Sequence, residues 1–300
     1  MAAKILGTED ALFVTSGTQG NQVAILTHCR PGDEVILEAE SHIFLYEAGV
    51  ASALAGVQTR PIRGIKGAMD PLDVKKAIRS EDIHHPYSGL ICLENTHNKA
   101  GGKVVPIEIM KAIYEIAKEK DIPVHLDGAR LFNAAVASGV PVTEFTQYVD
   151  TVQVCLSKGL SAPVGSILAG SKSFIKEAHK WRKRLGGGLR QAGVLAAPGI
   201  VALEKMVNRL AEDHTNARQL AEGLSAIPGL QMDVDGVETN IILCNIKETG
   251  LSNEQFLARL KEAGILAVPF DDGIIRFVTH REVTSDMVEM AVHRIRQLIG

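Results

Sequence analysis

Short apolar runs alternate with longer amphipathic stretches over the first two thirds of the chain. The runs have the length and the composition of strands, and turn-forming residues separate them from their neighbours. We expect strands at residues 11–15, 34–38, 57–62, 90–93, 123–126, 151–156 and 166–169. Helical spacing predicts helices at residues 18–28, 43–54, 71–80 and 106–120. This β/α alternation predicts an α/β fold, with a mainly parallel sheet flanked by helices.

The pattern changes in the last third of the chain. Helical character dominates from residue 172 to residue 226, and the run Gly186-Gly187-Gly188 interrupts it with a turn that is mobile or approaches a ligand. Beyond it we expect strands at residues 241–246, 266–269 and 274–278, with helices at 254–263 and 285–299. The chain therefore divides into a large domain over residues 1–210 and a smaller C-terminal α+β domain over residues 211–300.

Composition excludes several classes of protein. The chain has 300 residues, 46% of them hydrophobic, and its net charge of −3 gives no indication of a nucleic-acid partner. No apolar run is long enough to span a bilayer, and the first residues do not form a secretory signal. The four cysteines are scattered, and no cysteine or histidine spacing resembles a zinc site. We therefore expect no metal, and a cytoplasmic protein with reduced thiols.

The start of the chain carries a separate signal. Residues 1–6 have the pattern of a helix that ends at Gly7, and a fold seldom begins in the last turns of a helix. We expect the large domain to be incomplete at its N-terminus.

Polar residues follow four of the expected strands, at the point where each strand ends. These residues are Ser16-Gly17-Thr18, Glu94-Asn95-Thr96-His97-Asn98, Asp127 and Ser157-Lys158-Gly159. Ligands of open α/β sheets bind at the carboxyl ends of the strands. The four groups therefore predict one ligand-binding crevice.

Three of these groups each allow more than one interpretation. Glycines and hydroxyls that enter a helix at Gly17 expose N–H groups that suit a phosphate, or they form an ordinary helix cap. Asp127 can bind a metal, a ribose hydroxyl or a protonated ring nitrogen, or it can cap a helix. Lys158 follows a buried strand, where its amine can lose a proton and form a Schiff base with an aldehyde. The alternative for Lys158 is a side chain that extends to solvent.

Pyridoxal 5'-phosphate (PLP) requires three parts, which here follow successive strands. They are a phosphate cup, meaning the helix start at Ser16-Gly17-Thr18, an aspartate and a buried lysine. With these parts in place, the chain resembles the low-specificity L-threonine aldolases, which are PLP enzymes of fold type I with an aspartate-aminotransferase-like fold. The matching stretches run in order through nearly the whole chain, at residues 13–21, 40–42, 93–98, 125–130, 156–165, 182–191 and 276–280.

The resemblance implies how the cofactor is held. Lys158 would carry PLP as an internal aldimine, and Asp127 would pair with the pyridine nitrogen. Gly17 and Thr18 would bind the phosphate. Arg190 would reach the phosphate from a neighbouring subunit.

The resemblance also implies the substrate contacts. His42 would stack on the cofactor ring and is one candidate base, while His97 would lie near the β-hydroxyl of the substrate. Tyr46 would line the pocket. Arg130 and Arg276 would face the ring oxygen of the cofactor and the carboxylate of the substrate, for which a guanidinium is well suited.

The implied activity is retro-aldol cleavage of L-threonine or L-allo-threonine to glycine and acetaldehyde. Relatives are homotetramers built from dimers with shared active sites, so we expect a homo-oligomer. Another PLP lyase activity, such as phenylserine cleavage or β-elimination, stays open, as does a PLP-binding module with impaired catalysis. Members of the family also carry an N-terminal segment with an Asp-x-Arg-Ser-Asp-Thr-like motif that this sequence lacks, so we expect reduced aldol cleavage.

Overall fold

The computed structural model describes residues 1–299, which form two compact units. The first unit comprises Met1–Ala100 and Val104–Val207, and the second comprises Gly101–Lys103 and the chain from Asn208 onward. This boundary lies close to the expected one at residue 210. The segment Gly101–Lys103 belongs to the second unit although its neighbours in sequence belong to the first, and no local sequence pattern predicts this.

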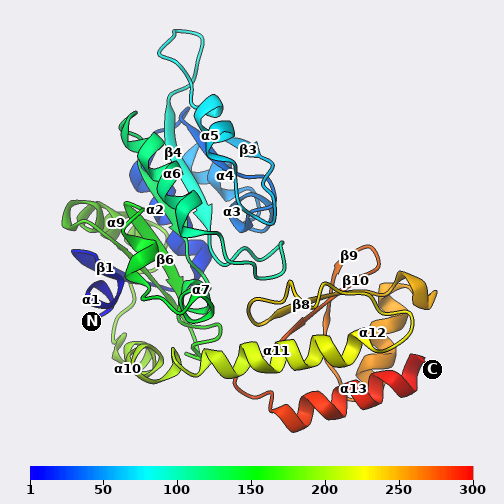
Figure 1. Ribbon diagram of the computed structural model, residues 1–300. Coiled ribbons are helices and arrows are strands. Elements are labelled where there is room, and N and C mark those ends of the chain that lie inside the picture. The colour runs from blue at the N-terminus through cyan, green and yellow to red at the C-terminus, as the bar shows by residue number, and fades with distance from the viewer. Residues whose placement is uncertain (300) are drawn as a thin grey trace. The chain divides into compact units, whose positions relative to one another are not determined.

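The first unit is built on a seven-stranded sheet with the order β1-β7-β6-β5-β4-β2-β3 (Figure 1). Its strands are β1 (Asp10–Val14), β2 (Glu34–Glu38), β3 (Gln58–Ile62), β4 (Ser88–Glu94), β5 (Val124–Asp127), β6 (Thr151–Cys155) and β7 (Ser166–Gly170). β2 to β6 pair in parallel, whereas β7 is antiparallel to both of its neighbours. The sequence-based expectation of a mainly parallel α/β sheet is confirmed.

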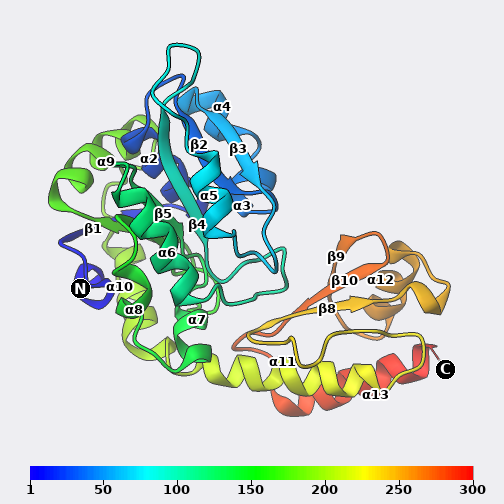
Figure 2. The same cartoon turned by 45° about the horizontal axis from the view of Figure 1, so that its top comes forward.

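Helices cover both faces of this sheet. The helices of this unit are α1 (Ala2–Leu6), α2 (Gly17–His28), α3 (His42–Leu45), α4 (Val50–Ala55), α5 (Pro71–Ala77), α6 (Ile107–Lys118), α7 (Leu131–Ser138), α8 (Thr143–Thr146), α9 (Lys172–Arg184), α10 (Gly193–Val201) and the π-helix η1 (Ala202–Met206). In β4, Leu90 and Cys92 pack into the same buried cluster as Ile25 of α2. Because side chains alternate along a strand, Ile91 and Leu93 point to the other face. Figure 2 shows α5 and α6 on that side of β4.

The second unit is the expected α+β module. Its antiparallel sheet has the order β8-β10-β9. The elements are β8 (Ile241–Asn245), β9 (Val268–Asp271), β10 (Ile274–Val278), α11 (Leu210–Ser225), α12 (Asn253–Glu262), α13 (Ser285–Ile299) and the 3₁₀ turn η2 (Lys247–Thr249). Leu224, Ile242, Phe277 and Ile295 form part of its buried core.

One predicted element is wrong. Residues 43–54 do not form a single helix, because the chain turns between α3 and α4. Between the two helices, Ala48 and Gly49 adopt φ values of 54° and 68°, a left-handed conformation that separates α3 from α4 and that glycine adopts at little cost. The apolar spacing continues across this break, which is why the sequence pattern does not reveal it. The turn directs the preceding residue, Glu47, into the interior, where it is 3% exposed.

Candidate active site

A cavity of about 310 Å³ lies at the carboxyl ends of β5 and β6, beside the start of α2. Its volume is at the lower end of the range of roughly 300–1,000 Å³ that is typical of small-molecule sites. The lining residues are Thr15, Ser16, Gly17, Thr18, Asn21, His42, Asp127, Ala129, Gln153, Cys155, Ser157, Lys158, Pro163, Val164 and Gly165. The structure therefore brings the expected phosphate cup, aspartate and lysine together around one space.

The start of α2 is both a helix cap and a set of free donors. Ser16 caps the helix, since its Oγ accepts a hydrogen bond from the Gln19 N–H at 3.1 Å. The N–H groups of Gly17 and Thr18 lie in the first turn, where a helix has no intrahelical acceptor for them. The positive end of the helix thus meets the cavity, and the two interpretations of this motif are compatible.

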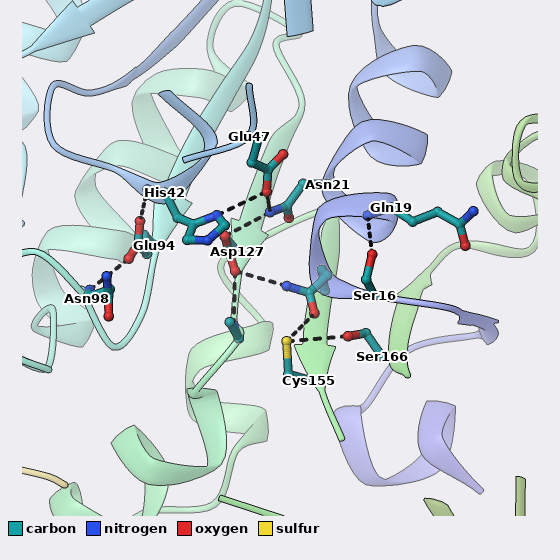
Figure 3. Close-up of polar contacts among 12 residues, drawn as sticks. Ser16, Gln19, Asn21, His42, Glu47, Glu94, Asn98, Asp127, Cys155 and Ser166 are labelled. Carbon is teal, nitrogen blue, oxygen red and sulfur yellow. Dashed lines mark hydrogen bonds and ion pairs between the residues drawn. The ribbon is translucent and has the colours of Figure 1, made fainter. Parts of the chain in front are cut away.

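Asp127 ends β5 and is 2% exposed. Its Oδ1 accepts hydrogen bonds from Gln153 Nε2 at 3.0 Å and from the Ala129 N–H at 3.1 Å. Its Oδ2 accepts one from Asn21 Nδ2 at 2.8 Å, as Figure 3 shows. An ionised carboxylate only accepts hydrogen bonds, so three donors stabilise the charged form of this buried group.

A chain of hydrogen bonds behind Asp127 has a fixed direction. Asn21 uses both hydrogens of its amide on the carboxylates of Asp127 and Glu47, each at 2.8 Å. Its Oδ1 must then accept from His125 Nε2 at 3.1 Å, so His125 Nδ1 accepts from the Thr151 hydroxyl at 2.9 Å. Thr151 Oγ1 in turn accepts from His28 Nε2 at 3.1 Å. This pattern places a proton on Nε2 of both histidines.

Burial supports the neutral state of these two histidines. It lowers the pKa of the His125 imidazole to about 3 and that of His28 to about 4, because a charged ring is poorly solvated in the protein interior. His125 is fully buried. His125 supports Asp127 through Asn21, to which both residues are hydrogen-bonded.

His42 begins α3 and is held at two points. Its backbone N–H donates to Glu94 Oε2 at 2.6 Å, and its ring Nδ1 lies 3.1 Å from Glu47 Oε1. The hydrogen bond with Glu47 raises the pKa of the His42 imidazole, and burial raises the pKa of the Glu47 carboxyl. A ring nitrogen of His42 and one carboxylate oxygen each of Glu47 and Asp127 lie within 4.8 Å of one another. A histidine and two carboxylates therefore share this end of the cavity.

Lys158 is half-buried and lines the cavity three residues after the end of β6. Two other expected residues lie nearby without lining it. Arg130 is half-buried, and its Nη1 lies 3.4 Å from Asn98 Oδ1. The ring of Tyr46 is 5.7 Å from that of His42 between centroids, and Tyr46 is 46% exposed.

His97 has both ring nitrogens engaged. Nε2 lies 3.0 Å from Glu38 Oε2, and Nδ1 accepts from the Ala100 N–H at 3.2 Å. The backbone of Gly67 covers the ring, since a Cβ at that glycine would lie 2.2 Å from His97 Cγ. The side chain is only 1% exposed. Its proximity to a substrate hydroxyl stays a prediction, and in the structure the ring contacts Glu38, Ala100 and Gly67.

The two remaining arginines are not among the residues that line the cavity. Arg190 is exposed just after the glycine run. Arg276 is half-buried in β10 of the second unit, where its guanidinium lies 5.3 Å from the centre of the Phe270 ring. Their roles toward phosphate and substrate stay predictions.

Sequence reasoning missed three polar residues of the site: Asn21, Glu47 and Gln153. Asn21 lies in the matching stretch but carried no assigned role. Gln153 had a recognisable signal, because a glutamine stands between two valines in a strand whose residues are all buried. Glu47 had none, since its burial depends on the turn at Ala48 and Gly49.

This sheet order, with a site at the strand ends, is that of the aspartate-aminotransferase-like proteins of PLP fold type I. Aspartate aminotransferase from Thermus thermophilus superposes with a TM-score of 0.70, covering 99% of this chain and 78% of its own, at 16% identity. The chain belongs to the beta-eliminating lyase family, whose family model matches residues 1–248.

Two other proteins have a nearer likeness. "Probable low-specificity L-threonine aldolase 2" of Arabidopsis thaliana is 47% identical over 292 residues, which cover 96% of this chain and 82% of the relative. The solved structure of a threonine aldolase from Leishmania major has a TM-score of 0.84 at 22% identity, and the match covers 99% of this chain and 87% of that one. The resemblance to L-threonine aldolases inferred from the sequence is confirmed.

The neutral state of His125 predicts a loss of stability in acid. Its folded pKa lies below the ordinary value of 6.5, so the unfolded chain binds a proton that the folded chain excludes. The contribution is therefore present above pH 6.5 and is lost as the pH falls below it. We expect His125→Gln to reduce the loss of unfolding free energy between pH 7.5 and 5.5 by about 1 kcal/mol.

Urea unfolding followed by the fluorescence of Trp181, the single tryptophan, measures this loss. The exposed His84 provides the control. His84→Gln should lose as much unfolding free energy as the wild type over the same change in pH. Equal losses in the wild type and His125→Gln would contradict the assignment.

Proposed function

We propose that this chain is a PLP-dependent lyase that cleaves L-threonine and L-allo-threonine to glycine and acetaldehyde. The observation that carries the proposal is the convergence of Lys158, Asp127 and the start of α2 on one cavity. Membership of the beta-eliminating lyase family and the 47% identity to the Arabidopsis protein support the same activity.

The donors and acceptors around the cavity fit PLP. The N–H groups of Gly17 and Thr18 suit its phosphate, and the amine of Lys158 suits its aldehyde. Asp127, held by three donors, suits a protonated pyridine nitrogen. Bound there, PLP supplies an electron sink for the pair released when the Cα–Cβ bond breaks.

The remaining roles belong to residues that orient the substrate and move its proton. Cleavage requires that the β-hydroxyl lose its proton, and His42 is the better candidate base because it lines the cavity. His97, with both ring nitrogens engaged, is the weaker candidate and is retained as a substrate-side residue. Arg130 and Arg276 are assigned to the ring oxygen and the substrate carboxylate, and Tyr46 to the pocket wall.

The family description favours one competing activity, β-elimination. The products separate the two reactions, because aldol cleavage yields acetaldehyde and glycine whereas elimination yields ammonia and a keto acid. Phenylserine cleavage would yield benzaldehyde in place of acetaldehyde. A module with impaired catalysis would bind PLP and release none of these products.

Assembly and location complete the proposal. We assign the first unit as the PLP-binding domain and expect at least a dimer, arranged as a dimer of dimers. Arg190 is exposed, and α10 exposes Val194, Ile200 and Val201, an apolar surface that suits a neighbouring subunit. The described helices include none that could cross a membrane. The four cysteines are unpaired, which suits the cytoplasm.

Lys158→Ala should abolish the absorption band of the lysine-linked cofactor and lower acetaldehyde release on the order of 1,000-fold or more, because no tethering amine remains. Lys158→Arg is the matched variant, since it keeps a positive charge but does not form the linkage. Lys158→Arg should also lose both the absorption band and the release of acetaldehyde. A spectrum retained by either variant would show that Lys158 is not the tether.

Asp127→Asn should lower turnover on the order of 100-fold and PLP affinity about 10- to 100-fold, because a neutral amide does not stabilise a protonated ring nitrogen. Cofactor fluorescence and the acetaldehyde assay measure the two effects. The exposed Asp82, changed to asparagine, is the control. Normal turnover in Asp127→Asn would reduce Asp127 to a helix-capping residue.

Arg190→Ala should weaken PLP binding about 10- to 100-fold if the residue reaches a neighbour's phosphate. In that case dilution to monomers should weaken PLP binding by the wild type but have little further effect on the variant. Light scattering combined with PLP titration measures both. Arg218→Ala serves as the control at an exposed arginine of the second unit. A monomer that binds PLP as tightly as the oligomer would contradict a shared site.

A further inference from the structure

Glu47 is a buried carboxylate that is hydrogen-bonded to both His42 and Asn21. Its side chain is fully buried, and it lies in the turn between α3 and α4, five residues after His42. Oε1 receives two hydrogen bonds, from His42 Nδ1 at 3.1 Å and from Asn21 Nδ2 at 2.8 Å. Oε2 is buried without a hydrogen-bond partner among the described residues. Burying a carboxylate in this way is costly, which indicates that its charge has a use.

The contact determines which nitrogen of His42 carries a proton. When Glu47 is ionised, its Oε1 accepts hydrogen bonds and donates none, so the Nδ1 that faces it is the protonated nitrogen. In the neutral ring, Nε2 is then the nitrogen left to accept a proton. Glu94 holds the backbone of His42 at the same time, so the residue is fixed both at its backbone and at its ring. Figure 3 shows the ring between these two carboxylates, close to Asp127.

We propose that Glu47 is a positioning residue of this site, which orients the imidazole of His42, keeps Nδ1 protonated and leaves Nε2 as the proton acceptor. The inference rests on the proposed function for the use that His42 makes of this proton. Through Asn21, Glu47 also shares its hydrogen-bond network with Asp127, so one amide sets the positions of both carboxylates.

The charges around His42 act in the same direction. Glu47, Asp127 and Glu94 are the acidic groups that face the ring, and each raises the pKa of the His42 imidazole, with the Glu47 hydrogen bond as the largest cause. Burial opposes them. Lys158 lines the same cavity. Removing the charge of Glu47 should therefore lower the affinity of His42 for a proton.

Glu47→Gln tests this with little change in shape, because the amide oxygen of glutamine still accepts from Nδ1–H. The first measurement is an NMR titration of the His42 Cε1–H in the cofactor-free protein, with the peak assigned by its loss in His42→Gln. We expect the midpoint in Glu47→Gln to fall by about one pH unit, a tenfold loss of proton affinity. Glu81→Gln, at an exposed carboxylate, should titrate as the wild type does.

Two further readouts separate charge from shape. The acid limb of the pH profile of kcat/KM should move to lower pH in Glu47→Gln, in step with the NMR midpoint, if the ring acts as a base. PLP affinity should stay within about threefold in Glu47→Gln, which keeps the hydrogen bond, and fall about tenfold in Glu47→Ala, which loses it. If Glu47→Gln does not fold, Glu47→Asp, which shortens the side chain by one methylene, should lower the midpoint in the same direction.

An unchanged His42 midpoint in the folded Glu47 variant would overturn the inference. Because this titration needs neither cofactor nor turnover, its outcome is distinct from that of the proposed function. A shifted midpoint in a protein that releases no acetaldehyde would uphold Glu47 and refute the aldolase. Acetaldehyde release with an unshifted midpoint would refute the role of Glu47 and uphold the aldolase.

Discussion

The site depends on keeping a carboxylate ionised in the protein interior. Asp127 is almost fully buried, and an unpaired charge there would cost several kcal/mol. The protein offsets this cost with three hydrogen bonds from fixed donors, and no lysine or arginine of residues 1–299 forms a salt bridge with Asp127. A direct cation would already neutralise Asp127. Neutral donors leave its charge available to a cationic ring nitrogen. The positions of Asn21, Gln153 and Ala129 around Asp127 meet this requirement.

The sheet brings these donors together. Asp127 and Gln153 lie on the paired strands β5 and β6 and are register partners, so the hydrogen bond between them follows from the pairing itself. Asn21 comes from the second turn of α2, which packs against the same two strands. The cap at Ser16 sets where this helix begins and hence which of its residues face Asp127 and which face the cavity.

The parts of the site that depend on strand ends were predictable from the sequence, and those that depend on a turn were not. Gly17, Asp127 and Lys158 each follow an apolar run, and parallel strands bring such positions to one edge. Gln153 was also detectable, as a polar side chain within a buried strand. Glu47 was not, because the apolar spacing of residues 43–54 is that of one helix while the backbone turns at Ala48 and Gly49. The pairing of His97 with Glu38, 59 residues away, likewise depends on tertiary contact.

The fixed direction of the hydrogen bonds from His28 through Thr151, His125 and Asn21 also bears on how this site can change during evolution. Each member donates to the next, so replacing one of them with a residue of opposite donor and acceptor pattern leaves its neighbours facing donor to donor or acceptor to acceptor. Single substitutions along the chain are then unfavourable even where the new residue fits sterically. The four positions should therefore show strong epistasis and change in concert.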